Sequence, residues 1–149
     1  MAATAIPSAP RAGTILAFDF GTRRIGVAVG EATTGLAHPL ATIEAERNDE
    51  RFAAIAALID EWRPKLMLVG LPTHADSTEH ELTARARRFA RQLEGRFGVA
   101  VELADERFTT LAATEALSAA GVTAREQRSV RDRVAAQLIL QAYLDQRRT

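Results

Sequence analysis

Two apolar runs joined by a short glycine turn constrain the fold of this 149-residue chain more than any other feature. The runs ILAFDF, residues 15–20, and IGVAVG, residues 25–30, are separated only by the tetrapeptide GTRR. Glycine permits the backbone conformations of tight turns, so this pattern predicts a β-hairpin. The first run predicts a fully buried strand, yet it contains Asp19. A buried carboxylate without a partner is strongly unfavourable or loses its charge, so Asp19 requires a specific partner.

Further along the chain, apolar runs alternate with helical periodicities. Strands are expected over residues 38–43, 65–70 and 99–107, and helices over residues 48–62, 78–96, 109 or 110 to 120, and 129 or 131 to 146. Residues 121–130 are polar and are expected to form a mobile loop. Sequential strands followed by βαβ units predict an α/β fold of the ribonuclease H-like type. Its five-stranded mixed sheet would join a three-stranded antiparallel meander to parallel strands, with helices on both faces.

The length and composition are typical of one globular domain. We expect residues 1–13, rich in Ala and Pro, to form a flexible tail and residues 14–149 to form a single domain. No apolar run reaches the roughly 18 to 20 residues of a membrane span, and the N-terminus lacks a continuous signal-peptide core, which favours the cytoplasm. The absence of Cys excludes disulfides and thiolate zinc sites.

Charge composition says little about partners. The 19 basic and 19 acidic residues balance, so no global basic field indicates nucleic acid. Only Lys65 among the basic residues is lysine, and a GC-rich genome explains most of this bias toward arginine.

Acidic residues from distant parts of the sequence are expected to meet at one edge of the sheet. Ligands of such folds collect at the carboxyl ends of strands, where Asp19 ends the first strand and Asp105 and Glu106 end the fifth. On the last helix, Asp132 shares its direction with apolar residues and therefore points toward the sheet. These apolar residues are Ala135, Ala136, Ile139 and Tyr143. Mg²⁺ and Mn²⁺ bind carboxylate oxygens, so such a cation would be the partner that Asp19 requires.

Each of these carboxylates also has a purely structural explanation. Asp19 could bond the backbone amides of the following turn, and Glu106 could pair at the surface with the arginine that follows it. Asp132, in the first turn of the expected helix, could form a capping arrangement with the serine three residues earlier. Strand alternation alone does not choose between Asp105 and Glu106. The histidines His38, His74 and His80 lack metal-binding spacing and are expected to be structural or exposed.

Four segments of the chain are characteristic in combination: DFGTRRIGVAVG (19–30), VGLP (69–72), DERFTT (105–110) and DRVAAQLILQAYL (132–144). In this order they resemble the YqgF family, also called RuvX, the Holliday junction resolvase or pre-16S rRNA nuclease family of the ribonuclease H-like superfamily. The resemblance covers residues 14–146. It implies a metal-dependent endonuclease, a hydrolase of phosphodiester bonds in structured nucleic acid. The expected role is processing of the 5′ end of pre-16S rRNA in ribosome biogenesis, with resolution of branched DNA as the alternative.

The resemblance also implies which residues act. It assigns three catalytic and metal-binding carboxylates: Asp19, Glu106 and Asp132. They would hold Mg²⁺ or Mn²⁺, with two ions expected. Three arginines could contact the phosphate backbone or be solvated charges: Arg23, Arg24 and Arg107. Arginines around the loop 121–130 could close over a duplex. The expected partners are precursor rRNA or branched DNA and a ribosome or pre-ribosome, without a membrane, for a monomer or homodimer.

Other functional classes compete with the nuclease. The D-x-G-T pattern also begins the phosphate loop of actin-like ATPases and sugar kinases. Those proteins bind nucleotide between two copies of the fold, and this chain is long enough for only one copy. The chain also contains the DFG triplet of protein kinases, but it has no H-R-D segment, which argues against a kinase. A non-catalytic nucleic-acid-binding or ribosome-associated factor would keep the same fold. A pure binder gains nothing from carboxylates that face phosphates, which favours the enzyme.

Overall fold

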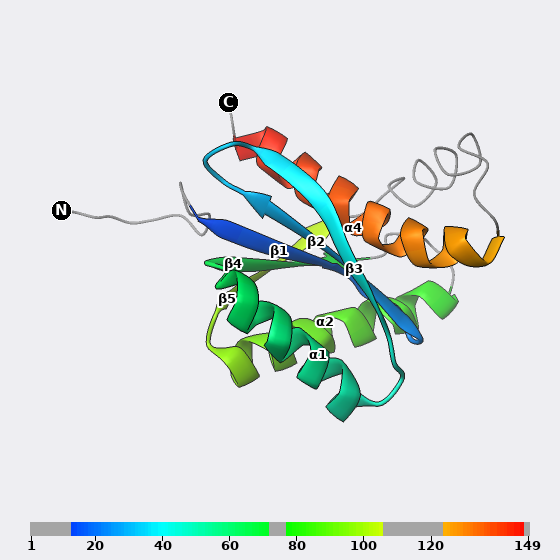
Figure 1. Ribbon diagram of the computed structural model, residues 1–149. Helices are drawn as coiled ribbons and strands as arrows, with labels where there is room; N and C mark the ends of the chain where they lie inside the picture. Colours follow the sequence, from blue (N-terminus) through cyan, green and yellow to red (C-terminus); the bar gives the residue numbers. More distant parts are fainter. Residues whose placement is uncertain (1–12, 72–76, 106–123, 148–149) are drawn as a thin grey trace.

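The computed structural model describes residues 13–71, 77–105 and 124–147, and the strands in these ranges form one five-stranded sheet (Figure 1). The strands are β1 (Thr14–Asp19), β2 (Arg24–Glu31), β3 (Leu36–Glu44), β4 (Leu66–Leu71) and β5 (Ala100–Asp105). Their order across the sheet is β3-β2-β1-β4-β5. The pairs β1–β2 and β2–β3 are antiparallel, whereas β4 runs parallel to both β1 and β5. The predicted meander and mixed sheet are confirmed.

Helices cover both faces of this sheet, as predicted. The described helices are α1 (Asn48–Trp62), α2 (Ser77–Phe97) and α4 (Ala124–Arg147). Figure 1 shows α1 and α2 on one face and α4 across the other. None of them is long and apolar enough to cross a membrane.

Strand alternation divides the core into two layers. In β1, Leu16 and Phe18 pack into the cluster that contains Phe89 of α2, while Ile15 and Ala17 pack into the cluster on the α4 side. Alternate side chains of a strand point to opposite faces, so β1 contributes to both layers. Burial in β1 is complete from Ile15 to Phe18 and then decreases, so that Asp19, the last strand residue, is half-buried rather than enclosed.

Glutamine side chains on α4 form hydrogen bonds with the backbone at the start of β3. Gln141 accepts a hydrogen bond from the Ala37 amide (3.0 Å) and donates one to the Gly35 carbonyl (2.9 Å). Gln137 donates to the Ala37 carbonyl (3.1 Å). These bonds satisfy backbone groups of β3 and fix the position of α4 along the sheet.

Two expectations about the last helix are wrong. Residues 124–130 were expected in a mobile loop, but α4 begins at Ala124. This segment is rich in Ala, Arg, Glu and Gln, which favour a helix, so polarity here did not indicate irregular backbone. Asp132 consequently lies eight residues after Ala124, well beyond the first turn, and the capping interpretation fails.

Most of the expected N-terminal tail and one expected helix lie outside the described residues. Residues 1–12 of the expected tail are not described, so the flexible tail stays a prediction. Gly13, the last residue of that expected tail, is described, and its carbonyl accepts a hydrogen bond from the Ala32 amide (3.0 Å). The expected helix ending at residue 120 falls in the range 106–123, which the structure does not describe.

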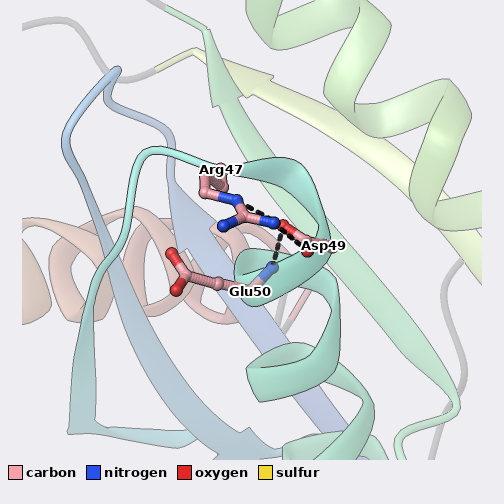
Figure 2. A network of polar contacts seen from close by, with 3 residues as sticks. All are labelled: Arg47, Asp49 and Glu50. Atoms are coloured by element: carbon pink, nitrogen blue, oxygen red, sulfur yellow. Dashed lines mark hydrogen bonds and ion pairs between the residues drawn. The ribbon is translucent and has the colours of Figure 1, made fainter.

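The start of α1 is stabilised by a small polar network (Figure 2). Arg47 pairs with Asp49 through Nη2 and Oδ2 (2.7 Å), and Asp49 Oδ1 accepts a hydrogen bond from the Glu50 amide (2.9 Å). An acid in the first turn also interacts favourably with the helix dipole. Both partners of the ion pair are largely exposed, so its contribution to stability is small.

Candidate functional site

Helix α4 touches the backbone of the sheet beside Asp19. Gly26 of β2 lies opposite Asp19 in the β1–β2 register. A Cβ atom added at Gly26 would lie 1.8 Å from the carbonyl oxygen of Asp132, so only glycine permits this approach. Asp19 shares strand parity with Ile15 and Ala17, which belong to the cluster on the α4 side. Asp19 and Asp132 therefore occupy neighbouring positions on the same face of the sheet.

The carboxylate of Asp132 is paired with Arg24, the first residue of β2. Arg24 Nε donates a hydrogen bond of 2.6 Å to Asp132 Oδ2, and the two side chains are 27% and 16% exposed. A charge-assisted bond of this length fixes the direction of the carboxylate and balances its charge. One carboxylate oxygen, Oδ1, is left by this bond for other ligands.

The third predicted carboxylate, Glu106, lies outside the described residues, as does Arg107. Within the described ranges no three acidic or histidine side chains form a cluster that could hold a metal ion. The predicted site thus has two carboxylates with a known place, and its metal-binding role stays a prediction. Among the histidines, His38 is exposed as expected.

The carboxyl ends of β1 and β5 lie at the same edge of the sheet. Phe18 pairs with Val69, and one residue later Gly70 of β4 pairs with Ala104 of β5. Asp19 at the end of β1 is therefore level with Ala104, one residue before the end of β5, with β4 between them. This arrangement agrees with the expectation that Asp19 and the end of β5 share one edge.

A pocket of about 410 Å³ opens between the β1–β2 turn, α2 and α4. Its charged lining residues are Arg23, Arg24, Glu81, Arg85 and Asp132. The pocket brings together the two described arginines that were predicted to bind phosphate and one predicted carboxylate. Arg85 and Glu81 of α2 were not predicted, because no pattern in the sequence says that α2 passes beside this turn.

A buried arginine holds the β1–β2 turn through hydrogen bonds to backbone carbonyls. Arg51 of α1 donates hydrogen bonds to the carbonyl oxygens of Gly21, at 2.6 Å, and Ala45. Burial lowers the pKa of the Arg51 guanidinium, the positive charge of Arg85 lowers it further, and Glu46 raises it. Arg51 thus ties the β1–β2 turn to the segment before α1 and adds positive charge near Arg85.

Arg51 was also missed at the sequence level, although a signal existed. It lies four residues before Ile55, which is fully buried, and so shares the apolar face of α1. A basic residue on an apolar helical face needs polar partners, and such residues are candidates for a structural or functional role.

Comparison with known proteins agrees with the resemblance. The RuvX family, described as Holliday junction resolvase, matches residues 13–146. A protein of Nitrosospira multiformis named "Putative pre-16S rRNA nuclease" is 57% identical over 140 residues, covering 94% of this chain and 93% of its own. Proteins of the same name from Chromobacterium violaceum and Neisseria gonorrhoeae are 56% and 54% identical, covering 88% and 89% of this chain and 96% and 88% of their own.

A solved structure shows the same fold. RuvC of Thermus thermophilus, in complex with a Holliday junction substrate, superposes with a TM-score of 0.55 over 91% of this chain and 96% of its own, at 17% identity. This likeness confirms the ribonuclease H-like arrangement of sheet and helices. With a family match that spans nearly the whole sequence and relatives more than half identical, the chain belongs to the RuvX family of nucleases.

Proposed function

We propose that this protein is a divalent-cation-dependent endonuclease that hydrolyses phosphodiester bonds in precursor 16S rRNA, at the 5′ end of the mature sequence. The names of its relatives support the choice of RNA. The observation that carries the catalytic part of the proposal is the contact of Asp132 with Gly26, which brings α4 beside Asp19. Two carboxylates from sequence-distant elements on one face of a sheet form a site at which a divalent cation is attracted to both charges.

The chemistry of these side chains fits Mg²⁺ or Mn²⁺. Hard divalent cations prefer carboxylate oxygens together with water and substrate phosphates, and Asp19 and Asp132 supply such oxygens. The bound cations would lower the pKa of a water molecule and stabilise the charge that develops on phosphate oxygens. Arg24 would orient Asp132 through its 2.6 Å bond, so that Oδ1 is presented to the cation.

We assign the third carboxylate to Glu106 rather than Asp105. Even-numbered positions of β5 lie on the α4 face, because Glu102 contacts Tyr143 (3.4 Å) and Arg147 (3.5 Å) of α4. In an extended strand, position 106 has the same parity as position 102. This parity agrees with the family pattern, which also favours Glu106 over Asp105.

Arginines beside the carboxylates would hold the substrate. Arg23 and Arg24 line the pocket next to Asp132, and Arg51 fixes the turn that carries Arg23. Arginine binds phosphate oxygens through its planar guanidinium, which positions a strand without reading its sequence. The proposal therefore predicts selection of substrate by shape rather than by bases contacted at this site.

Cleavage assays with isosteric variants test the catalytic assignment. Purified protein is incubated with Mn²⁺ and labelled precursor 16S rRNA, and the initial rate is compared among wild type, Asp19→Asn, Asp132→Asn and Asp60→Asn. Loss of a cation ligand is expected to lower the rate at least 100-fold. Asp60 is an exposed acid on α1, paired only with Arg63 at 3.6 Å among described residues, so its variant should cleave like wild type. Equal residual cleavage in all four proteins would indicate a contaminant and contradict the proposal.

Resolution of branched DNA is the second candidate, favoured by the family description and by the RuvC complex. Mapping the products distinguishes the two. A cut near the mature 5′ end of the RNA, with slow cleavage of a four-way DNA junction, supports rRNA processing. Paired symmetric cuts in the junction support a resolvase, which would also require two active sites in one assembly.

A further inference from the structure

We infer that Arg85 of α2 binds a backbone phosphate of the nucleic-acid strand next to the bond that is cut, so that the pocket beside Asp132 is a phosphate subsite. The inference rests on the proposed function, since it takes the substrate to be nucleic acid. It adds a contact from the α1/α2 face of the sheet, whereas Asp19 and Asp132 lie on the α4 face.

The position of the pocket carries this inference. Its walls come from both sides of the sheet: Arg85 from α2, and Asp132 from α4. The β1–β2 turn with Arg23 lies between them. A strand that places one phosphate at Asp132 and continues through this pocket would reach Arg85, which lines the same pocket. The pocket volume of about 410 Å³ leaves room for a phosphate with part of its sugar.

The charge distribution in the pocket favours an anion on the α2 side. Arg24 is neutralised by Asp132 at 2.6 Å, whereas Arg85 forms none of the ion pairs recorded among the described residues. Arg51 lies close enough for the charge of Arg85 to disfavour its protonated form. Two guanidinium groups that repel each other are both stabilised when an anion binds between or beside them.

Glu81, one turn before Arg85 on α2, is the opposing charge. It lines the same pocket and is exposed, so it can turn toward water when a phosphate enters. Its presence limits non-specific attraction, because the pocket then has a modest rather than a large positive charge.

Binding measurements without divalent cations test the inference separately from catalysis. Affinity for a labelled precursor 16S rRNA and for a four-way DNA junction is measured in chelator over a series of salt concentrations. The proteins are wild type, Arg85→Ala, Arg85→Lys and Arg88→Ala. Arg88 is the matched control, because it is also an exposed arginine on the same helix but does not line the pocket.

Arg85→Ala is expected to bind about tenfold more weakly than wild type, and the slope of log K against log salt should fall by about 0.7 to 0.9, as for one lost phosphate contact. Arg85→Lys should keep the slope, and Arg88→Ala should behave like wild type. The nucleic acid on which the loss appears identifies the source of the phosphate.

Equal binding by Arg85→Ala and Arg88→Ala would overturn the inference, as would weaker binding by Arg85→Ala with an unchanged salt slope. Either result leaves the nuclease proposal standing, because cleavage depends on the carboxylates. A wild-type protein that binds neither nucleic acid would overturn the inference, whereas the nuclease proposal is decided by the cleavage assay in Mn²⁺.

Discussion

At the level of a single residue, Gly26 determines how closely α4 approaches the sheet. Replacement Gly26→Ala would put a methyl carbon 1.8 Å from the Asp132 carbonyl oxygen, a distance that backbone atoms cannot tolerate. The helix must move away, and overpacking of this kind lowers the free energy of unfolding by about 1 to 3 kcal/mol. A shift of Asp132 by about 1 Å is expected to reduce cleavage roughly 100-fold. Urea unfolding and the RNA cleavage assay measure the two effects.

Gly95 provides the matched control for this prediction. It lies inside α2, and a Cβ there would meet no atom within 4 Å. Gly95→Ala should therefore stabilise the protein by about 0.5 to 1 kcal/mol through helix propensity and leave cleavage unchanged. Wild-type activity and stability in Gly26→Ala would show that α4 does not pack on Gly26 as described.

Single residues also show what the sequence alone could predict. Asp19 was singled out because it ends a buried apolar run, and Asp132 because the helical period gives the direction of its side chain without knowledge of packing. The structure places both on one face of the sheet, and their catalytic role stays a prediction. The Arg24–Asp132 pair joins residues 108 positions apart and depends on where α4 crosses β2, which no local pattern encodes. The same holds for Arg85, whose place depends on how α2 passes the β1–β2 turn.

At the level of an element, the strands were easier to predict than the ends of helices. Buried strands such as β1 and β4 are short apolar runs, and their bounds follow from composition. Helix α4 begins in a polar segment whose seven residues before Arg131 were assigned to a loop. Amphipathic periodicity identifies a helix by its apolar residues, so the polar start of α4 was missed.

The β1–β2 turn depends on an anchor in another element, Arg51 of α1. Arg51→Met keeps the apolar stem but removes the hydrogen bonds to the Gly21 and Ala45 carbonyls. Because these bonds are charge-assisted and the side chain is buried, the free energy of unfolding should fall by about 2 to 4 kcal/mol. The freed turn should also raise the KM for RNA more than it lowers kcat. Urea unfolding and steady-state kinetics measure these changes.

Arg47→Met is the control for Arg51→Met. Arg47 is only four residues away, but its ion pair with Asp49, drawn in Figure 2, is exposed to solvent. Its loss should change stability by less than about 1 kcal/mol and leave the kinetics unchanged. Equal effects of the two substitutions would mean that Arg51 contributes through general surface charge and not as an anchor of the turn.

At the level of the whole molecule, the site joins parts of the chain that fold into different layers. β1 lies in the middle of the sheet, and α4 packs across one face as the last described element (Figure 1). A ligand that bridges Asp19 and Asp132 binds only when these layers are assembled, so it must stabilise the folded state. Under the proposed function, cation binding and global stability are therefore expected to be coupled.

This coupling gives a prediction that does not require turnover. Mn²⁺ at 100 times its dissociation constant should add about 2.7 kcal/mol to the stability of the wild-type protein and raise its Tm by several degrees. Asp132→Asn should show little of this rise, because the cation loses a charged ligand, whereas Asp60→Asn should show all of it. Thermal unfolding in chelator and in Mn²⁺ measures the difference. The same rise in all three proteins would place the bound ions elsewhere. A rise confined to wild type and Asp60→Asn, in a protein without cleavage activity, would identify a cation-binding factor that has kept the site and lost the reaction.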